Sequence, residues 1–130
     1  MKFMVLMYAD PATTASMTPT ERTDVFTRHE ALHKDLKATG ELLNGAGLTY
    51  PDDTTTLRWK PDAAPATTNG PFAAAAVEHL TAYYVVECEN AERAQEIAAR
   101  VVDFHVVAVE VRPIHDWFGM GAAPEAGPEA

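Results

Sequence analysis

The chain has 130 residues, 47% of them hydrophobic and 22% charged, with a formal net charge of −9. This composition is typical of one globular domain, and its acidity excludes the basic face that a nucleic-acid-binding protein needs. No apolar run reaches membrane-spanning length, and the short N-terminal run is interrupted by Asp10 without a signal-peptide cleavage pattern.

The first half of the chain predicts a strand, a long helix and a second strand. Residues 3–8 are nearly all apolar, which is typical of a strand buried on both faces. A Thr-rich loop over 11–17 then leads to a helix with Thr18 as N-cap, which should end at Gly40. Its apolar face consists of Val25, Leu32 and Leu36. The second predicted strand, 41–48, contains Gly45 and Gly47, which indicate a bulge or a close backbone approach.

The second half predicts strands separated by a loop and one helix. The strands cover 54–59, 79–89 and 106–112, with a loop over 60–68. Asn90 should cap the second helix. Its apolar face is Ala94, Ile97, Ala98 and Val101. Residues 119–130 contain mainly Gly, Ala, Pro and Glu, so we predict one domain over 1–118 followed by a disordered tail.

This order of elements points to an α+β ferredoxin-like sandwich, with an antiparallel sheet and both helices on one face. The opposite face would carry Tyr, Val and Leu side chains, which are too apolar to face water alone. We therefore expect a second copy of the chain to cover it. The single Cys88 excludes a disulfide framework and a multi-thiolate metal site, and we interpret it as a buried small hydrophobe in a cytoplasmic protein.

A possible zinc motif lies in the first predicted helix. Residues 29–33 read His-Glu-Ala-Leu-His, and two histidines one helical turn apart can bind zinc with Glu30 as a general base. Five residues with two free positions arise often by chance, and no third ligand follows convincingly, although Glu110 and His115 are available. We therefore expect no metal and no cofactor.

His29 lies near the middle of the apolar face of this helix, whereas His33 lies at its margin. A polar ring in such a place needs a partner. One interpretation is a core histidine with a satisfied hydrogen bond, and the other is a functional acid–base group. The sequence alone leaves both open.

The segment Asn69-Gly70-Pro71-Phe72 is predicted to form a turn. Gly allows positive φ, and Pro restricts its own φ and the backbone conformation of the preceding residue. A strand with Tyr83-Tyr84-Val85-Val86 follows, then a helix and a strand that ends in Arg112-Pro113. This order resembles the YCII-related family, in particular its branch with an Asp-Gly-Pro-Phe signature. The resemblance covers nearly the whole chain.

The resemblance implies a ferredoxin-like fold that forms a dimeric α+β barrel. It also implies an active site in which a helical histidine is paired with an acidic residue, which here would be His29 and Asp10. The carboxylate would fix the tautomer of the ring while the other nitrogen exchanges a proton with the substrate. The alternative for Asp10 is a turn-initiating residue before Pro11.

Asn69 replaces the aspartate of the family signature and cannot act as a base. We therefore assign the segment a turn role, with Asn69, Gly70, Pro71 and Phe72 bordering a substrate pocket. Tyr83, Tyr84 and Trp59 could line the pocket too, although packing explains each of them. Two functions follow. The chain is a small enzyme that performs elimination or isomerisation on a small cyclic compound, or a non-catalytic module that binds a small ligand or a regulatory partner. Neither substrate nor ligand can be named.

Overall fold

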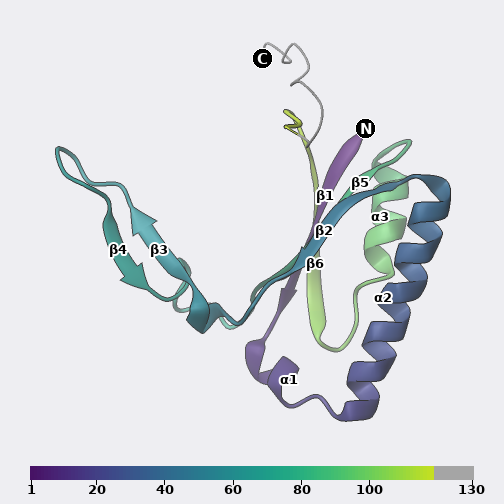
Figure 1. The fold of residues 1–130 in the computed structure, drawn as a ribbon, viewed down its shortest axis with the longest axis horizontal. Coiled ribbons are helices and arrows are strands. Elements are labelled where there is room, and N and C mark those ends of the chain that lie inside the picture. Colours follow the sequence, from purple (N-terminus) through teal and green to yellow (C-terminus); the bar gives the residue numbers. More distant parts are fainter. Residues whose placement is uncertain (119–130) are drawn as a thin grey trace.

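The computed structural model describes residues 1–118, and these form a four-stranded antiparallel sheet, a separate two-stranded hairpin and helices (Figure 1). The elements are β1 (Lys2–Ala9), α1 (Pro11–Ala15), α2 (Pro19–Thr39), β2 (Leu42–Gly47), the 3₁₀ turn η1 (Pro51–Asp53), β3 (Thr55–Arg58), β4 (Ala66–Asn69), β5 (His79–Glu87), α3 (Ala91–Ala99) and β6 (Val106–Pro113). The sheet order is β2-β5-β1-β6, with α2 after β1 and α3 after β5. This is the predicted ferredoxin-like topology. The predicted tail over 119–130 lies outside the described residues.

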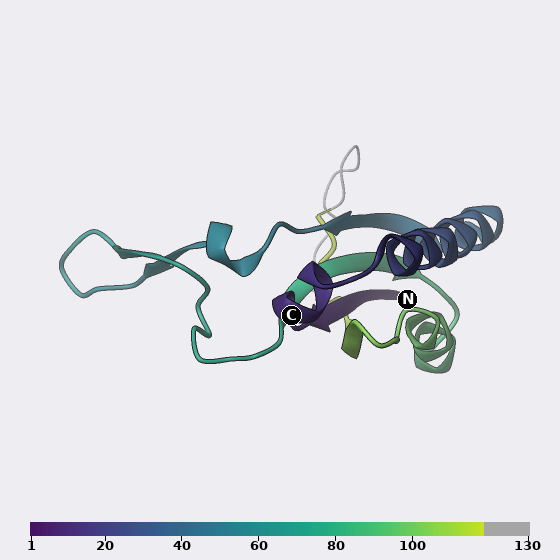
Figure 2. The same ribbon diagram turned by 90° about the horizontal axis from the view of Figure 1, so that it is seen from below.

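Both long helices lie on one side of the sheet, as predicted, and the β3–β4 hairpin reaches away from the other side (Figures 1 and 2). Alternate residues of β1 are fully buried beneath the helices, while those between them are less buried. Successive side chains of a strand point to opposite faces, so this pattern marks the covered face. The buried β1 residues are Phe3, Val5, Met7 and Ala9.

The helices begin and end where the sequence predicts. Thr18 Oγ1 accepts a hydrogen bond from the Glu21 N–H at 3.1 Å, and the Glu21 carboxylate accepts one from the Thr18 N–H at 2.9 Å. Gly40 ends α2 in the left-handed conformation, with φ of 76°. Leu32 and Leu36 are fully buried, as is the predicted apolar face of α3.

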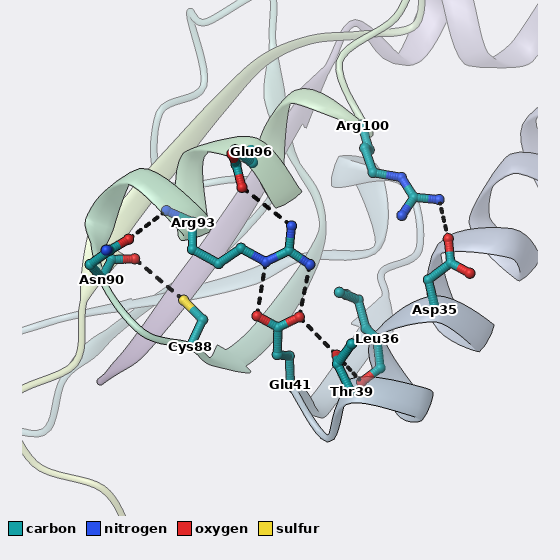
Figure 3. A network of polar contacts seen from close by, with 9 residues as sticks. All are labelled: Asp35, Leu36, Thr39, Glu41, Cys88, Asn90, Arg93, Glu96 and Arg100. Carbon is teal, nitrogen blue, oxygen red and sulfur yellow. Dashed lines mark hydrogen bonds and ion pairs between the residues drawn. The ribbon is translucent and has the colours of Figure 1, made fainter.

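A polar clasp joins the end of α2 to α3 (Figure 3). The Arg93 guanidinium donates two hydrogen bonds to the Glu41 carboxylate, at 2.9 and 2.8 Å. Arg93 is therefore the main cause of the lowered pKa of Glu41. Asn90 accepts from the Arg93 N–H and so caps α3, as predicted. This bidentate pair fixes α3 against the start of β2.

Three segments differ from the predictions. The predicted loop over 11–17 contains the short helix α1, because Asp10 and Pro11 start a helical turn as well as they start a loop. The predicted loop over 60–68 ends in β4, because residues 66–69 pair with β3 across the hairpin. Strand β5 ends at Glu87, so Cys88 lies just beyond it, buried as predicted.

Candidate functional site

Tyr84 places a hydroxyl group between two histidines of α2. The Tyr84 Oη atom lies 2.6 Å from His29 Nδ1 and 2.7 Å from His33 Nε2, so it is hydrogen-bonded to both rings. The histidines are four residues apart on α2, which puts them on one helix face one turn apart. Tyr84 reaches them from β5, on the sheet face that the helices cover.

Gly45 makes room for the Tyr84 ring. Gly45 and Tyr84 are paired across β2 and β5, and a Cβ atom added at Gly45 would lie 2.6 Å from Tyr84 Cδ1 and 3.0 Å from the Tyr83 carbonyl oxygen. Only glycine allows the ring to lie flat over this strand. The predicted close approach is therefore confirmed, and β2 also has a register shift between Leu42 and Asn44.

A cavity of about 440 Å³ opens beside this cluster, between α2 and the edge formed by β2 and β5. Its volume is within the range of small-molecule sites. The cavity exists because β2 offers glycine and alanine where larger side chains would fill the space. Its lining comprises His29, His33, Lys37, Leu42, Gly45, Ala46, Gly47, Ala82 and Tyr84.

The electrostatics of the cluster favour a neutral His29 ring and a neutral Tyr84 hydroxyl. Burial lowers the pKa of His29 below its usual value, and the neighbouring His33 and Arg28 lower it further. Burial also raises the pKa of Tyr84 to about 12, so its hydroxyl keeps its proton at neutral pH. His29 therefore remains an unprotonated base at pH 7.

Asp103 lies near the same stretch of α2 and holds Arg28. Burial alone would raise the pKa of its carboxyl group, but hydrogen bonds from the Val106 N–H, the Arg28 guanidinium and the His105 N–H hold it at about 2. Its side chain is only 8% exposed. The carboxylate thus fixes the turn before β6 to α2, one residue before His29.

Asp10 occupies another position in the fold. Its carboxylate caps α1 by accepting a hydrogen bond from the Ala12 N–H at 2.9 Å. Among the described residues, no hydrogen bond joins Asp10 to His29, whose partner is Tyr84. The structure thus brings His29 together with Tyr84 and His33, whereas the Asp10 carboxylate is bonded at the start of α1.

The Asn69–Phe72 segment belongs to the hairpin. Gly70 adopts the positive φ expected of the turn, at 116°, and its carbonyl accepts a hydrogen bond from Thr56 Oγ1 at 2.8 Å. The Phe72 ring is 69% exposed and lies beneath the Arg58 guanidinium, 4.6 Å from it. None of residues 69–72 lines the cavity beside His29.

Tyr83 lies on the sheet face opposite Tyr84, as the alternation along β5 requires. It pairs with Leu6 and with Ala46 across the sheet, and it does not line the cavity. A second cavity, of about 370 Å³, lies between α1, η1 and the start of β5, next to His79. It contains neither His29 nor the Asn69–Phe72 segment.

The model of the YCII-related domain matches residues 1–118. The chain belongs to the YCII-related family. The match is to the family as a whole, so assignment to the branch with the Asp-Gly-Pro-Phe signature stays a prediction. A search of curated proteins finds no match to this chain.

The sequence patterns did not predict the roles of two residues in this YCII-related domain, His33 and Tyr84. The sequence pattern puts His33 at the margin of its helix face and is explained by packing at Tyr84, yet the two side chains share a hydrogen bond. The available signal was the alternation of β5. Tyr84 and Val86 are two residues apart on β5, so their side chains point to the same face of the sheet. Because Val86 enters the core, Tyr84 must also face α2.

The His29 and His33 pair does not extend to a metal-binding group in the described part of the chain. No three or more His, Cys, Asp or Glu side chains there lie together in a way that could hold an ion. The ring nitrogens that face each other are bonded to the Tyr84 hydroxyl. The absence of zinc stays a prediction. Within residues 1–118, no helix has the length and apolar character that crossing a membrane requires.

Proposed function

We propose that this YCII-related protein is a small acid–base enzyme in which His29 transfers a proton to or from a small cyclic compound, as in an elimination or isomerisation. The observation that carries the proposal is the hydrogen bond between His29 and the buried Tyr84 hydroxyl at the wall of an open cavity. A base needs a lone pair, access to substrate and a partner that orients its ring.

His29 has these properties. One ring nitrogen, Nδ1, is bonded to Tyr84, which leaves Nε2 available to a bound molecule. Its lowered pKa keeps it unprotonated at neutral pH, the state in which it can accept a proton. The pairing of His29 with Asp10 remains a prediction, since the Asp10 carboxylate is engaged at the start of α1.

The test is proton exchange in heavy water. Small cyclic ketones and lactones are first screened for a thermal shift of the protein, and those that bind are then followed by proton NMR for loss of the signal next to the carbonyl group. The wild-type chain should accelerate exchange of at least one compound, and His29→Gln should reduce the rate by about 100-fold.

His115→Gln is the matched control, because His115 is exposed and, within residues 1–118, is paired with the neighbouring Asp116 alone. It should exchange the compound at the wild-type rate. Equal rates for wild type and His29→Gln would contradict the proposal. Destabilisation of the variant would be visible in its melting curve, and exchange is then compared at a temperature at which both chains are folded.

One observation favours the second function, a non-catalytic binding module. The group that orients His29 is a hydroxyl and not a carboxylate, so it stabilises an imidazolium less well than an aspartate would. A compound that raises the melting temperature strongly and exchanges no proton in any chain would support binding without catalysis.

We propose in addition that the chain forms a homodimer through the helix-free face of its sheet. This face carries Met4, Leu6 and Tyr83, which are half-buried in the single chain and are neighbours on β1 and β5. Such a surface is more stable when it is covered. Charged Lys2, Glu87 and Glu110 lie at its margins and would flank the apolar centre.

Sedimentation equilibrium at micromolar concentration should give twice the chain mass. Met4→Lys should yield a folded monomer, because it introduces a charge at the centre of the proposed interface. Phe26→Lys is the control, since Phe26 is an exposed apolar residue that lies on α2. A wild-type monomer would contradict the dimer. The cytoplasmic location predicted from the sequence and the identity of the ligand stay predictions.

A further inference from the structure

The Tyr84 hydroxyl has one proton and two histidine neighbours. Among the described residues, Oη has no other hydrogen-bond partner than His29 Nδ1 and His33 Nε2. A hydroxyl donates one hydrogen bond and can accept others. When the hydroxyl proton is used within the cluster, one ring accepts it, while the other ring donates its own N–H to the same oxygen.

The proton count links the two rings. If His29 donates from Nδ1, the hydroxyl donates to His33 Nε2, and both rings carry their proton on Nδ1. If the hydroxyl donates to His29 Nδ1, His33 donates from Nε2, and both rings carry their proton on Nε2. With neutral rings, the two histidines therefore hold the same tautomer, and changing one changes the other.

The outer nitrogen of each ring is left without a protein partner. His29 Nε2 and His33 Nδ1 have no partner among the described residues, and neither is a buried atom without a hydrogen bond. Both nitrogens are therefore open to solvent, and both rings line the cavity. In either tautomer one outer nitrogen is a base and the other carries a proton.

We propose that His29, Tyr84 and His33 form a proton relay that isomerises an unsaturated carbonyl compound by moving a proton between two of its atoms. This proposal rests on the proposed function and adds the reaction and two residues to it. A substrate C–H bond breaks and its proton goes to His29 Nε2, while the electron pair shifts into the conjugated system. The His29 Nδ1 proton moves to Tyr84 Oη, the hydroxyl proton moves to His33 Nε2, and the His33 Nδ1 proton forms the new bond on the substrate.

The relay transfers protons without leaving a net charge on the three side chains. The cluster begins and ends neutral, differing only in the tautomer of both rings, so no imidazolium has to form in a site that disfavours it. Water can reset the tautomers through the same outer nitrogens. Both inner nitrogens lie within 2.7 Å of the same hydroxyl oxygen, so a proton passes between the rings in two short steps.

The rest of the cavity indicates the class of compound. Its other walls are mainly backbone, Leu42 and alanine side chains, which suit a small apolar ring or chain. Lys37 is the cation on this wall, one helical turn beyond His33, and it forms no ion pair within residues 1–118. A carboxylate on the unsaturated compound would complement it.

The test uses the full chain without any ligand. Nitrogen-15 NMR of the labelled protein at about pH 8, above the usual histidine pKa of about 6.5, reports the tautomer of each ring. His29 and His33 should show the same tautomer fraction. Opposite tautomers would mean that both rings donate to the hydroxyl oxygen, and this result would overturn the relay.

Tyr84→Phe should abolish the equality, because each ring then adopts its own preference. Tyr8→Phe is the control, since Tyr8 is bonded to Glu110 on the opposite face and should leave both rings unchanged. Unchanged tautomers in Tyr84→Phe would also overturn the relay. The wild-type measurement does not depend on how well the variant folds. Equal tautomers in a chain that exchanges no compound would show that the three groups share protons, and would refute the isomerisation together with the enzymatic function.

Discussion

Replacing Gly45 by alanine tests the geometry on which the site depends. The added Cβ would lie 2.6 Å from Tyr84 Cδ1, shorter than real contacts show, and 3.0 Å from the Tyr83 carbonyl oxygen, which is tighter than most contacts. Tyr84 Cδ1 is a ring atom near the backbone, and the Tyr83 oxygen belongs to the backbone itself. A small side-chain rotation therefore cannot relieve these contacts. The Tyr84 ring has to move away from β2.

The loss of folding free energy in Gly45→Ala follows from the displaced contacts of the Tyr84 ring. Overpacking of this kind costs about 1–3 kcal/mol. Weakening the hydrogen bonds of Tyr84 to His29 and His33 adds about 0.5–1.5 kcal/mol each. Alanine restricts the unfolded chain more than glycine does, and this stabilises the folded state by about 0.4–1 kcal/mol. The net loss, taken from the middle of these ranges, should be about 3 kcal/mol, which corresponds to a fall of about 10 °C in melting temperature for a domain of this size.

Gly47→Ala is the matched control on the same strand. Nothing lies within 4 Å of the Cβ position at Gly47, so this variant should be as stable as wild type or slightly more stable. Urea unfolding at pH 7 measures both variants. Equal stability of Gly45→Ala and Gly47→Ala would refute the argument. So would a destabilised Gly45→Ala whose His29 and His33 signals match those of wild type, because the ring would not have moved.

Further predictions concern charged groups. Asp103→Asn should lower the free energy of unfolding by about 2 kcal/mol at pH 7, since the folded carboxyl has a pKa of about 2 against its ordinary 3.8. This difference should be complete above about pH 4 and should shrink towards pH 2; urea titrations that give a constant difference would contradict it. Glu41→Gln should lower the free energy of unfolding by about 1–2 kcal/mol at neutral pH, because the variant loses the charge-assisted bonds to Arg93. Since the pKa of Glu41 is lowered in the folded chain, this stabilisation is lost in acid. The exposed Glu96→Gln should change the free energy of unfolding very little. In an NMR titration His29 should protonate below the usual 6.5, and a normal value would show that burial does not disfavour its charged form.

Local chemistry was enough to predict most of the fold. Thr18 with Glu21 and Gly40 define α2 by hydrogen bonds that form within a few residues, and Asn90 defines the start of α3 in the same way. The alternation of β1 and the apolar face of α3 then imply one buried layer between sheet and helices. These features depend on neighbours along the chain, so the sequence determines them without knowledge of the rest.

The site depends on contacts between distant residues. His29 was recognised as a polar ring on an apolar face, but its partner lies 55 residues away on another element. The register of β5 against β2 decides that Tyr84 lies over Gly45, and the bulge after Leu42 adjusts that register. Neither can be computed from spacing alone, because a shift of one residue would turn Tyr84 to the opposite face.

The sequence by itself determined that this chain has capped helices, an antiparallel sheet and a histidine in need of a partner, because each of these follows from local hydrogen bonding and from the period of the apolar residues. Only the tertiary structure decided that the partner is Tyr84, that Asp10 caps α1, and that residues 69–72 lie on the hairpin away from the cavity. Hydrogen-bond partners are chosen by distance in space, which the packing of β2 and β5 beneath α2 establishes.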